Sequence, residues 1–179
     1  MRIRLFNKKD LDEAVSLVIN SYKKENKKKV WAKDMAKEYI LVHYRMNKEL
    51  CFVATDNQKI IGIGLCMLKP EYTNYIIDSH VLIVHPDYRR KKVATKLLKK
   101  IITKAKNKYG IDKIESSVKS LTTFPISWYE SIGFREKKHY TLVKANIDNV
   151  LKSIWLYTPA NIATTIYPYV ELLLIPIPT

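Results

Sequence analysis

The sequence predicts an α/β fold in which strands and helices alternate around one mixed sheet. Three observations support this. The β-branched run at 81–84 is too short for a helix and precedes Pro86, so it is expected to form a strand that ends near His85. After it, apolar residues recur at steps of three and four between lysines, which indicates a helix lying on the sheet. These residues are Val93, Leu97, Leu98, Ile101, Ile102 and Ala105. Third, apolar runs at 50–55 and 60–68 flank a polar turn, which predicts a β-hairpin.

Composition fits one compact domain rather than a disordered or fibrous chain. With 47% apolar and 27% charged residues, the 179-residue chain can bury a sizeable core. Cys51 and Cys66 each lie in an apolar run, so both are expected to be buried thiols in a reducing compartment rather than metal ligands or a disulfide. The longest uncharged apolar stretch, at 172–177, is too short to cross a bilayer, and no signal peptide is visible. We therefore expect a cytoplasmic protein with no membrane partner and no metal.

The net charge of +15 allows a nucleic-acid partner, because basic surfaces bind phosphate backbones. Only six of the 32 basic residues are arginines, however, and the abundance of Lys, Ile, Tyr and Asn is what an AT-rich genome would encode. Most lysines are therefore expected to be solvated surface. The adjacent pair Arg89 and Arg90 is the more informative charge.

The N-terminal part predicts a strand at 2–6 and two helices. Asp10, with Glu13 three residues later, matches a capping box, so a helix is expected to begin there and to run to about residue 22. Apolar residues at helical spacing predict a second helix at 30–46.

The middle of the chain continues the alternation. Gly62 and Gly64 lie inside the second hairpin strand and mark either a bulge or a close backbone approach. Residues 69–74 are expected to form a loop before the strand that ends near His85. Further expected elements are a strand at 113–118, a helix at 124–132 and a strand at 135–143.

The last part, 144–179, differs from the rest in composition. Its four charges sum to zero, and it holds four of the seven prolines and no glycine. An amphipathic helix is expected from Ile147 to Trp155, ending before Pro159. We expect this apolar extension to pack on its own domain, 1–143, or across a homodimer interface.

The turn between the strand at 81–84 and the helix at Val93 is strongly basic. Its residues are Arg89, Arg90, Lys91 and Lys92. A helix N-terminus has unpaired N–H groups and partial positive charge, so four cations there are unfavourable unless an anion binds. The position indicates a phosphate site, although a solvated basic turn is the simpler alternative.

Two motifs in order resemble the GNAT superfamily of N-acetyltransferases. The family's strand, Arg/Gln-x-x-Gly-x-Gly/Ala turn and helix resemble 82–94, with Arg89 as the first residue, Ala94 as the last and Lys92 where the central glycine stands. The family's Tyr-x-x-x-Gly-Phe resembles Tyr129 to Phe134. The resemblance covers about residues 1–143 and is nearest, on these motifs, to the N-terminal acetyltransferase branch.

The resemblance implies a fold and a co-substrate. The fold is a mixed, mostly antiparallel sheet of six to seven strands flanked by helices, splayed between the fourth and fifth strands. The co-substrate is acetyl-CoA, with its pyrophosphate on the basic turn and its pantetheine along the strand before it. The residues implied in binding it are Leu82, Ile83, Val84, Arg89, Arg90, Lys91, Lys92, Val93, Ala94, Thr95 and Tyr129. We expect Lys92 to keep an ordinary right-handed conformation.

The resemblance also implies catalytic residues. Tyr129 is expected to protonate the departing thiolate, and Asp78 or His80 to accept a proton from the amine, directly or through water. By strand alternation Asp78 and His80 should point the same way. Each of the three also has a purely structural alternative, as a core aromatic, a loop end or a buried histidine.

The function implied is direct transfer of an acetyl group from acetyl-CoA to a primary amine in a ternary complex. The amine acceptor is a protein N-terminus, a lysine, a small amine or an aminoacyl-tRNA. The alternative is a non-catalytic module of the same fold that binds acyl-CoA or nucleic acid.

Overall fold

The structure, a computed structural model, describes residues 1–25, 30–117, 123–136 and 145–156. The chain divides into two compact units, Met1–Thr123 and Phe124–Thr179, which are described separately below. Most of the strand predicted at 135–143 and most of the C-terminal extension lie outside the described residues, and residues 135 and 136 are not in a strand.

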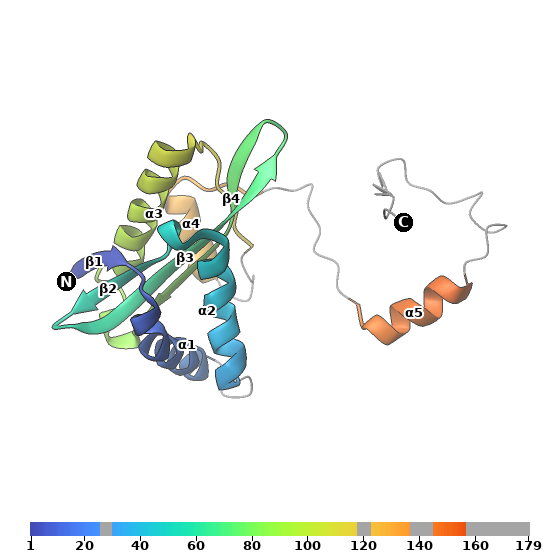
Figure 1. The fold of residues 1–179 in the computed structure, drawn as a ribbon, viewed down its shortest axis with the longest axis horizontal. Coiled ribbons are helices and arrows are strands. Elements are labelled where there is room, and N and C mark those ends of the chain that lie inside the picture. Colours follow the sequence, from blue (N-terminus) through green and yellow to red (C-terminus); the bar gives the residue numbers. More distant parts are fainter. Residues whose placement is uncertain (26–29, 118–122, 137–144, 157–179) are drawn as a thin grey trace. The chain divides into compact units, whose positions relative to one another are not determined.

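The first unit contains a four-stranded antiparallel sheet in the order β1-β2-β3-β4 (Figure 1). The strands are β1 (Arg2–Leu5), β2 (Phe52–Asp56), β3 (Lys59–Glu71) and β4 (Asn74–Val84). The predicted hairpin of β2 and β3 is confirmed. The loop expected at 69–74 is wrong, because β3 continues to Glu71 and pairs with β4 down to Asn74. The cross-strand pairing of Pro70 with Tyr75 lies at the end of the ladder, where a missing N–H matters least.

A fifth segment joins the outer edge of β4 in parallel. Ile77 donates its N–H to the carbonyl of Lys113 at 3.1 Å, and its own carbonyl accepts from the N–H of Glu115 at 2.7 Å. Beyond this bridge, no described residue pairs with the outer edge of β4. The mixed, mostly antiparallel sheet that diverges after its fourth strand is the predicted fold.

Helices cover both faces of the sheet (Figure 1). On one face α1 (Leu11–Glu25) and α2 (Lys33–Asn47) enclose a core with side chains of β2, β3 and β4. On the other, α3 (Val93–Tyr109) buries the predicted apolar stripe, except that Ile102 is 36% exposed.

Gly62 and Gly64 explain how closely α3 lies on β3. A Cβ at Gly62 would come within 3.0 Å of Cγ1 of Val93 and 3.2 Å of the carbonyl oxygen of Ile83, and one at Gly64 within 3.0 Å of Cδ1 of Ile101. Close approach is therefore the reason for both glycines, and Gly62 also adjoins a β-bulge, because Ala54 pairs with Gly62 whereas Thr55 pairs with Ile60.

The predicted cap of the first helix is wrong by three residues. Asn7 is the N-cap of a short 3-10 turn, η1 (Lys8–Asp10), that leads into α1, and Asp10 accepts the Asn7 N–H at 2.7 Å as the other half of the capping box. Arg4 donates two hydrogen bonds to the Asp10 carboxylate, at 2.7 and 2.8 Å. Glu13 instead accepts the N–H of Ile60 at 2.7 Å.

The second unit contains the predicted helices α4 (Thr123–Ser131) and α5 (Ile147–Leu156). Gly133 follows α4 with φ +103°, and the N–H of Phe134 donates to the carbonyl of Tyr129 at 3.0 Å. None of the described helices has the length and apolarity needed to cross a membrane.

Candidate functional site

The basic turn connects β4 to α3 in a conformation suited to glycine. A 3-10 turn, η3 (Pro86–Tyr88), is followed by Arg90 with φ +61° and Lys92 with φ +59° and ψ 19°. The expectation that Lys92 is right-handed is therefore wrong. The backbone at residue 92 keeps the left-handed conformation that the family's glycine allows. The Cβ of Lys92 makes this conformation strained. Lys91 between them does not have a positive φ, and an alternation of backbone conformations is typical of anion-binding nests.

The first turn of α3 offers unpaired donors to an anion. Val93, Ala94 and Thr95 precede the first helical bond, which Lys96 makes to the carbonyl of Lys92 at 3.0 Å. Lys92, the N-cap, makes no side-chain cap, and no acidic residue lies in the first turn. A pyrophosphate fits this set of donors, because it would satisfy N–H groups that no described side chain satisfies.

The four basic side chains of the turn are exposed, and two of them, Lys91 and Arg89, contact neighbouring groups. The Nζ atom of Lys91 lies 5.0 Å from the centroid of the Tyr88 ring, and the Tyr88 hydroxyl donates to Asp56 at 3.4 Å. Arg89 donates from Nε to the carbonyl of Val84 at 3.5 Å. Arg90 and Lys92 form no ion pair with the described residues, so both can turn toward a ligand.

β4 contains one extra residue, Asp78. Met67 of β3 pairs with Ser79 and Leu68 pairs with Ile77, so Asp78 has no partner across the ladder. This is a β-bulge, and it shifts the alternation of side chains by one. Ile77 accordingly packs in the same core as the even-numbered Leu82 and Val84.

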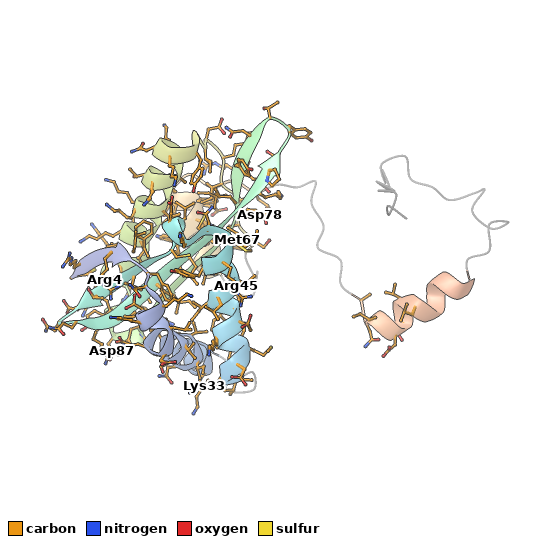
Figure 2. The ribbon with its side chains drawn as sticks, viewed as in Figure 1. Arg4, Lys33, Arg45, Met67, Asp78 and Asp87 are labelled. Carbon is orange, nitrogen blue, oxygen red and sulfur yellow. The ribbon has the colours of Figure 1, made fainter. Side chains whose placement is uncertain are left out.

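The bulge contradicts the expectation that Asp78 and His80 point the same way. His80 pairs with Cys66, whose side chain belongs to the core under α3, whereas Asp78 alternates with Ile77 and faces the side of α1 and α2. Asp78 lies on β4 close to the hairpin with β3 (Figure 2). The two candidate bases therefore lie on opposite faces of one strand.

Asp78 belongs to a charged group that the sequence did not predict. Its Oδ1 atom lies 2.9 Å from Nζ of Lys69, and Oε2 of Glu115 lies 3.8 Å from the same nitrogen. Only the register of three strands brings these side chains together. The alternation of side chains along a single strand does not reveal such a group from the sequence.

His80 is 9% exposed, and its surroundings favour the neutral ring. Burial lowers the pKa of His80 below its ordinary 6.5, while a hydrogen bond to the backbone of Glu115 acts in the opposite direction. At neutral pH the ring is therefore uncharged and able to accept a proton.

The backbone of β4 presents polar groups along its outer edge. His85 donates its N–H to the carbonyl of Ile61 on β3 at 2.8 Å, so after the bulge the odd-numbered N–H groups face β3. The N–H groups of Leu82 and Val84 consequently point to the outer edge, while that of Ile83 faces β3. The side chain of Ile83 is buried in the core beneath α1 and α2.

Tyr129 belongs to the second unit, whereas Asp78, His80, Leu82–Val84 and the basic turn share the first. The Tyr129 ring lies 4.9 Å from the ring of Phe134 and 4.8 Å from that of Trp128, measured between centroids. The Tyr-x-x-x-Gly-Phe segment therefore folds back on itself. Among the residues that the structure describes, no group of His, Cys, Asp and Glu is placed to hold a metal ion.

Known proteins similar to this chain are named as acetyltransferases. The chain is 28% identical over 139 residues to an uncharacterized N-acetyltransferase of Methanocaldococcus jannaschii, a match covering 76% of this chain and 61% of that protein's length. Its fold is similar to a possible acetyltransferase from Clostridium difficile 630, with TM-score 0.68, 18% identity, and coverage of 82% of this chain and 97% of that one. It is also similar to a predicted acetyltransferase from Clostridium acetobutylicum solved with acetyl-CoA, with TM-score 0.62, 20% identity, and coverage of 80% and 95%.

The family follows from a match within the chain itself. Residues 47–136 match the acetyltransferase (GNAT) domain, and this segment is 90 of the 179 residues. It contains β4, the basic turn, α3 and the Tyr129 segment. The chain therefore belongs to the GNAT acetyltransferase family.

Proposed function

We propose that the protein is an acetyl-CoA-dependent N-acetyltransferase that transfers the acetyl group directly to a primary amine in a ternary complex. The observation that carries this proposal is the turn before α3, where Arg90 and Lys92 are left-handed and the first helical turn has no cap. A folded chain retains such strain where a ligand uses it. Acetyl-CoA would supply the activated acetyl thioester.

Acetyl-CoA binding is assigned to three groups of residues. The basic turn of Arg89, Arg90, Lys91 and Lys92 and the N–H groups of Val93, Ala94 and Thr95 bind the pyrophosphate. The outer edge of β4 binds the pantetheine through the backbone of Leu82 and Val84. Ile83 supports that edge from the core rather than contacting the ligand.

The chemistry requires a neutral amine, a stabilised oxyanion and a protonated leaving thiolate. Asp78 or His80 accepts the proton of the amine, the outward N–H of Leu82 or Val84 donates to the developing oxyanion, and the Tyr129 phenol protonates the thiolate. The nitrogen–acyl bond forms as the sulfur–acyl bond breaks, and the Tyr129 proton is restored through solvent.

The acceptor proposed is the α-amine of a protein chain, as in the N-terminal acetyltransferase branch. A lysine, a small amine and an aminoacyl-tRNA are the other candidates. The ion pairs of Lys69 with Asp78 and Glu115 support a cationic acceptor, because this face already holds one ammonium group between two carboxylates.

The main test combines an acceptor screen with Tyr129→Phe. Labelled acetyl-CoA is offered with N-terminal peptides, lysine peptides, polyamines and aminoacyl-tRNA. With the best acceptor, Tyr129→Phe should lower kcat by about 10²- to 10⁴-fold and leave acetyl-CoA affinity unchanged. Tyr72→Phe is the matched control, because Tyr72 is fully exposed. Unchanged turnover in Tyr129→Phe would reject its role as acid, and no acetylated product with any acceptor would favour a non-catalytic protein.

The two candidate bases are separated by pH. The value of kcat/KM falls at low pH as the catalytic base becomes protonated. A variant that lacks the base should therefore lose this acidic limb of the pH profile. For His80 this limb is expected below pH 6.5, because burial lowers the pKa of the imidazole. Asp78→Asn and His80→Gln are therefore compared, and the variant that keeps the limb is not the base.

We also propose that residues 1–143 form the catalytic domain and that the extension at 144–179 packs on it or on a second copy. The exposed apolar side chains Ile147, Val150 and Leu151 of α5 support a packed extension. Sedimentation of the full chain and of Ile147→Glu with Leu151→Glu tests the homodimer. A monomer in both would exclude it.

A further inference from the structure

Positive charge is concentrated on one helix. α3 carries six lysines and no acidic residue, whereas α1 and α2 have net charges of −1 and +1. An excess of lysine codons alone would spread lysines over every surface helix. The α3 lysine face consists of Lys96, Lys99, Lys100, Lys104, Lys106 and Lys108.

Four of these lysines form a single row. Lys96, Lys100, Lys104 and Lys108 are four residues apart, so each lies one turn from the next along α3. Like charges at this spacing destabilise a helix, and no acidic residue within α3 offsets them. In the described part of the chain the row has one ion pair, between Lys108 and Glu49.

Three lysines of the row, Lys100, Lys104 and Lys108, line a groove beside α3. The groove lies between α3 and strands β1 and β2, has a volume of about 490 Å³, and is lined by Arg4, Leu5, Phe52, Lys100, Thr103, Lys104, Asn107 and Lys108. Arg4, on β1 (Figure 2), also lines the groove, but its guanidinium donates two hydrogen bonds to Asp10, so the lysines of α3 supply the other cations of the groove. Leu5 and Phe52 supply an apolar floor between the cations.

We propose that the α3 lysine face and this groove dock the phosphate backbone of a nucleic-acid duplex. The lysines of the row follow one another by about 6 Å of rise along α3, which suits a polyanion with regularly spaced charges, and bound phosphates would remove the repulsion within the row. Single strands are usually held by stacking on exposed aromatic rings, and the lysine face has none.

A lipid surface fits these observations less well. An interfacial helix inserts an apolar stripe, but the stripe of α3 is already buried against the sheet, and Ile102 alone is exposed on it. The docking face also lies along the length of α3, apart from the turn at its N-terminus to which the pyrophosphate is assigned. Docking of a duplex on this face therefore does not depend on acetyl-CoA binding at the turn.

The salt dependence of binding tests the proposal. A fluorescent duplex of mixed sequence and about 20 base pairs, made as RNA and as DNA, is titrated with full-length protein between about 50 and 200 mM salt. Log affinity should fall linearly with log salt, with a slope that grows by about 0.9 for each phosphate contact. Replacing Lys96, Lys99, Lys100 and Lys106 together by Gln should make the slope shallower by about 3 to 4.

A matched variant separates this face from net charge. Lys8, Lys9, Lys33 and Lys37 are exposed lysines outside α3, and replacing them by Gln removes the same four charges. This control should bind with nearly the wild-type slope. Equal losses in the two variants, or no binding by wild type at the lowest salt, would overturn the proposal.

Two further measurements keep the result interpretable. The α3 variant should melt at or above the wild-type temperature and bind acetyl-CoA as wild type does, because none of its four lysines lies in the basic turn. If it fails to fold, the pairs Lys96 with Lys100 and Lys99 with Lys106 are replaced separately, and each should remove about half of the slope change. Tighter binding to a polyglutamate peptide or to anionic vesicles than to either duplex would also reject a nucleic-acid partner.

Discussion

The two faces of the sheet differ in how they are packed and charged. On the α3 face, one helix lies close to β3 because Gly62 and Gly64 have no side chain, and its outer surface carries only positive charge. On the α1 and α2 face, two helices with nearly balanced charge enclose a larger core rimmed by aromatic residues. The proposed phosphate site and the close approach of a helix to the sheet are therefore on the same side of the molecule.

The aromatic residues on the α1 and α2 face pack against one another and have a structural role. Ring contacts run from Tyr22 to Trp31, Tyr39 and His43, with centroids 4.9 to 5.6 Å apart. His43 is 2% exposed, and its Nδ1 atom lies 2.7 Å from the carbonyl oxygen of Tyr39. These contacts fix α2 against α1.

The largest effect is expected from filling the gap under α3. Gly62→Val would place side-chain atoms against Val93 and the Ile83 carbonyl, so the free energy of unfolding should fall by about 1 to 3 kcal/mol. Acetyl-CoA affinity should also fall, because α3, whose N-terminus carries the proposed pyrophosphate site, must move away from β3. Leu65→Met, a volume-conserving change on the other face, should cost under about 1.5 kcal/mol and leave affinity intact. Urea unfolding measures the free energy of unfolding, and calorimetry measures acetyl-CoA affinity. If Gly62→Val kept the stability and affinity of wild type, α3 would not be held close to β3.

A somewhat smaller effect is expected at the start of α1. Asp10→Ala removes half of the capping box and the partner of Arg4, so the free energy of unfolding should fall by about 1 to 2 kcal/mol. Arg4 lowers the pKa of Asp10, so this stability is present above the ordinary carboxyl pKa and is lost as pH falls through the lowered value. Urea unfolding at pH 7 and in acid tests both statements. Equal stability of wild type and Asp10→Ala at pH 7 would mean that the cap contributes nothing.

The two buried histidines allow the faces to be compared by pH. Burial lowers the pKa of His43 on one face and of His80 on the other. The folded state then favours the neutral rings, so stability is full above pH 6.5 and falls as pH drops, by at most about 1.4 kcal/mol per pH unit for each ring. Unfolding of His43→Leu and His80→Leu between pH 7.5 and 5.5 should show a weaker pH dependence than wild type. If one variant kept the pH dependence of wild-type stability, the histidine on the other face would account for all of that dependence.

The smallest effect is expected from restoring the family's glycine. Lys92→Gly relieves a left-handed strain of about 1 to 2 kcal/mol but adds chain entropy of about 0.5 to 1 kcal/mol, so stability should rise by about 0.5 to 1 kcal/mol. Acetyl-CoA binding should persist with a shallower salt dependence. Lys91→Gly is the control, because Lys91 is not left-handed and should lose stability. A destabilised Lys92→Gly would mean that the lysine side chain holds the turn.

The sequence predicted the elements better than it predicted their geometry. Periodicity alone located α3 and the β2–β3 hairpin, because both depend on which side chains avoid water. The bulge at Asp78 was not predictable in the same way, because an extra residue is visible only against the register of the neighbouring strand. A right-handed Lys92 was expected because residues with a Cβ prefer negative φ. The φ at this position is determined by the turn rather than by the residue. Asn7 was missed as the N-cap because Asp10 offered an equally good pattern.

The bulge at Asp78 also determines how insertions and deletions would act on β4. A strand with strict alternation tolerates changes of two residues, since these keep each side chain on its own face. In β4, removing the single residue at 78 would restore ordinary pairing with β3, because Ile77 already lies opposite Leu68 and Ser79 opposite Met67. Ile77 would keep its place in the α3 core and its hydrogen bonds to Lys113 and Glu115, and the chain would lose the carboxylate that contacts Lys69. The bulge therefore lets this strand lose one residue without turning any other side chain to the opposite face.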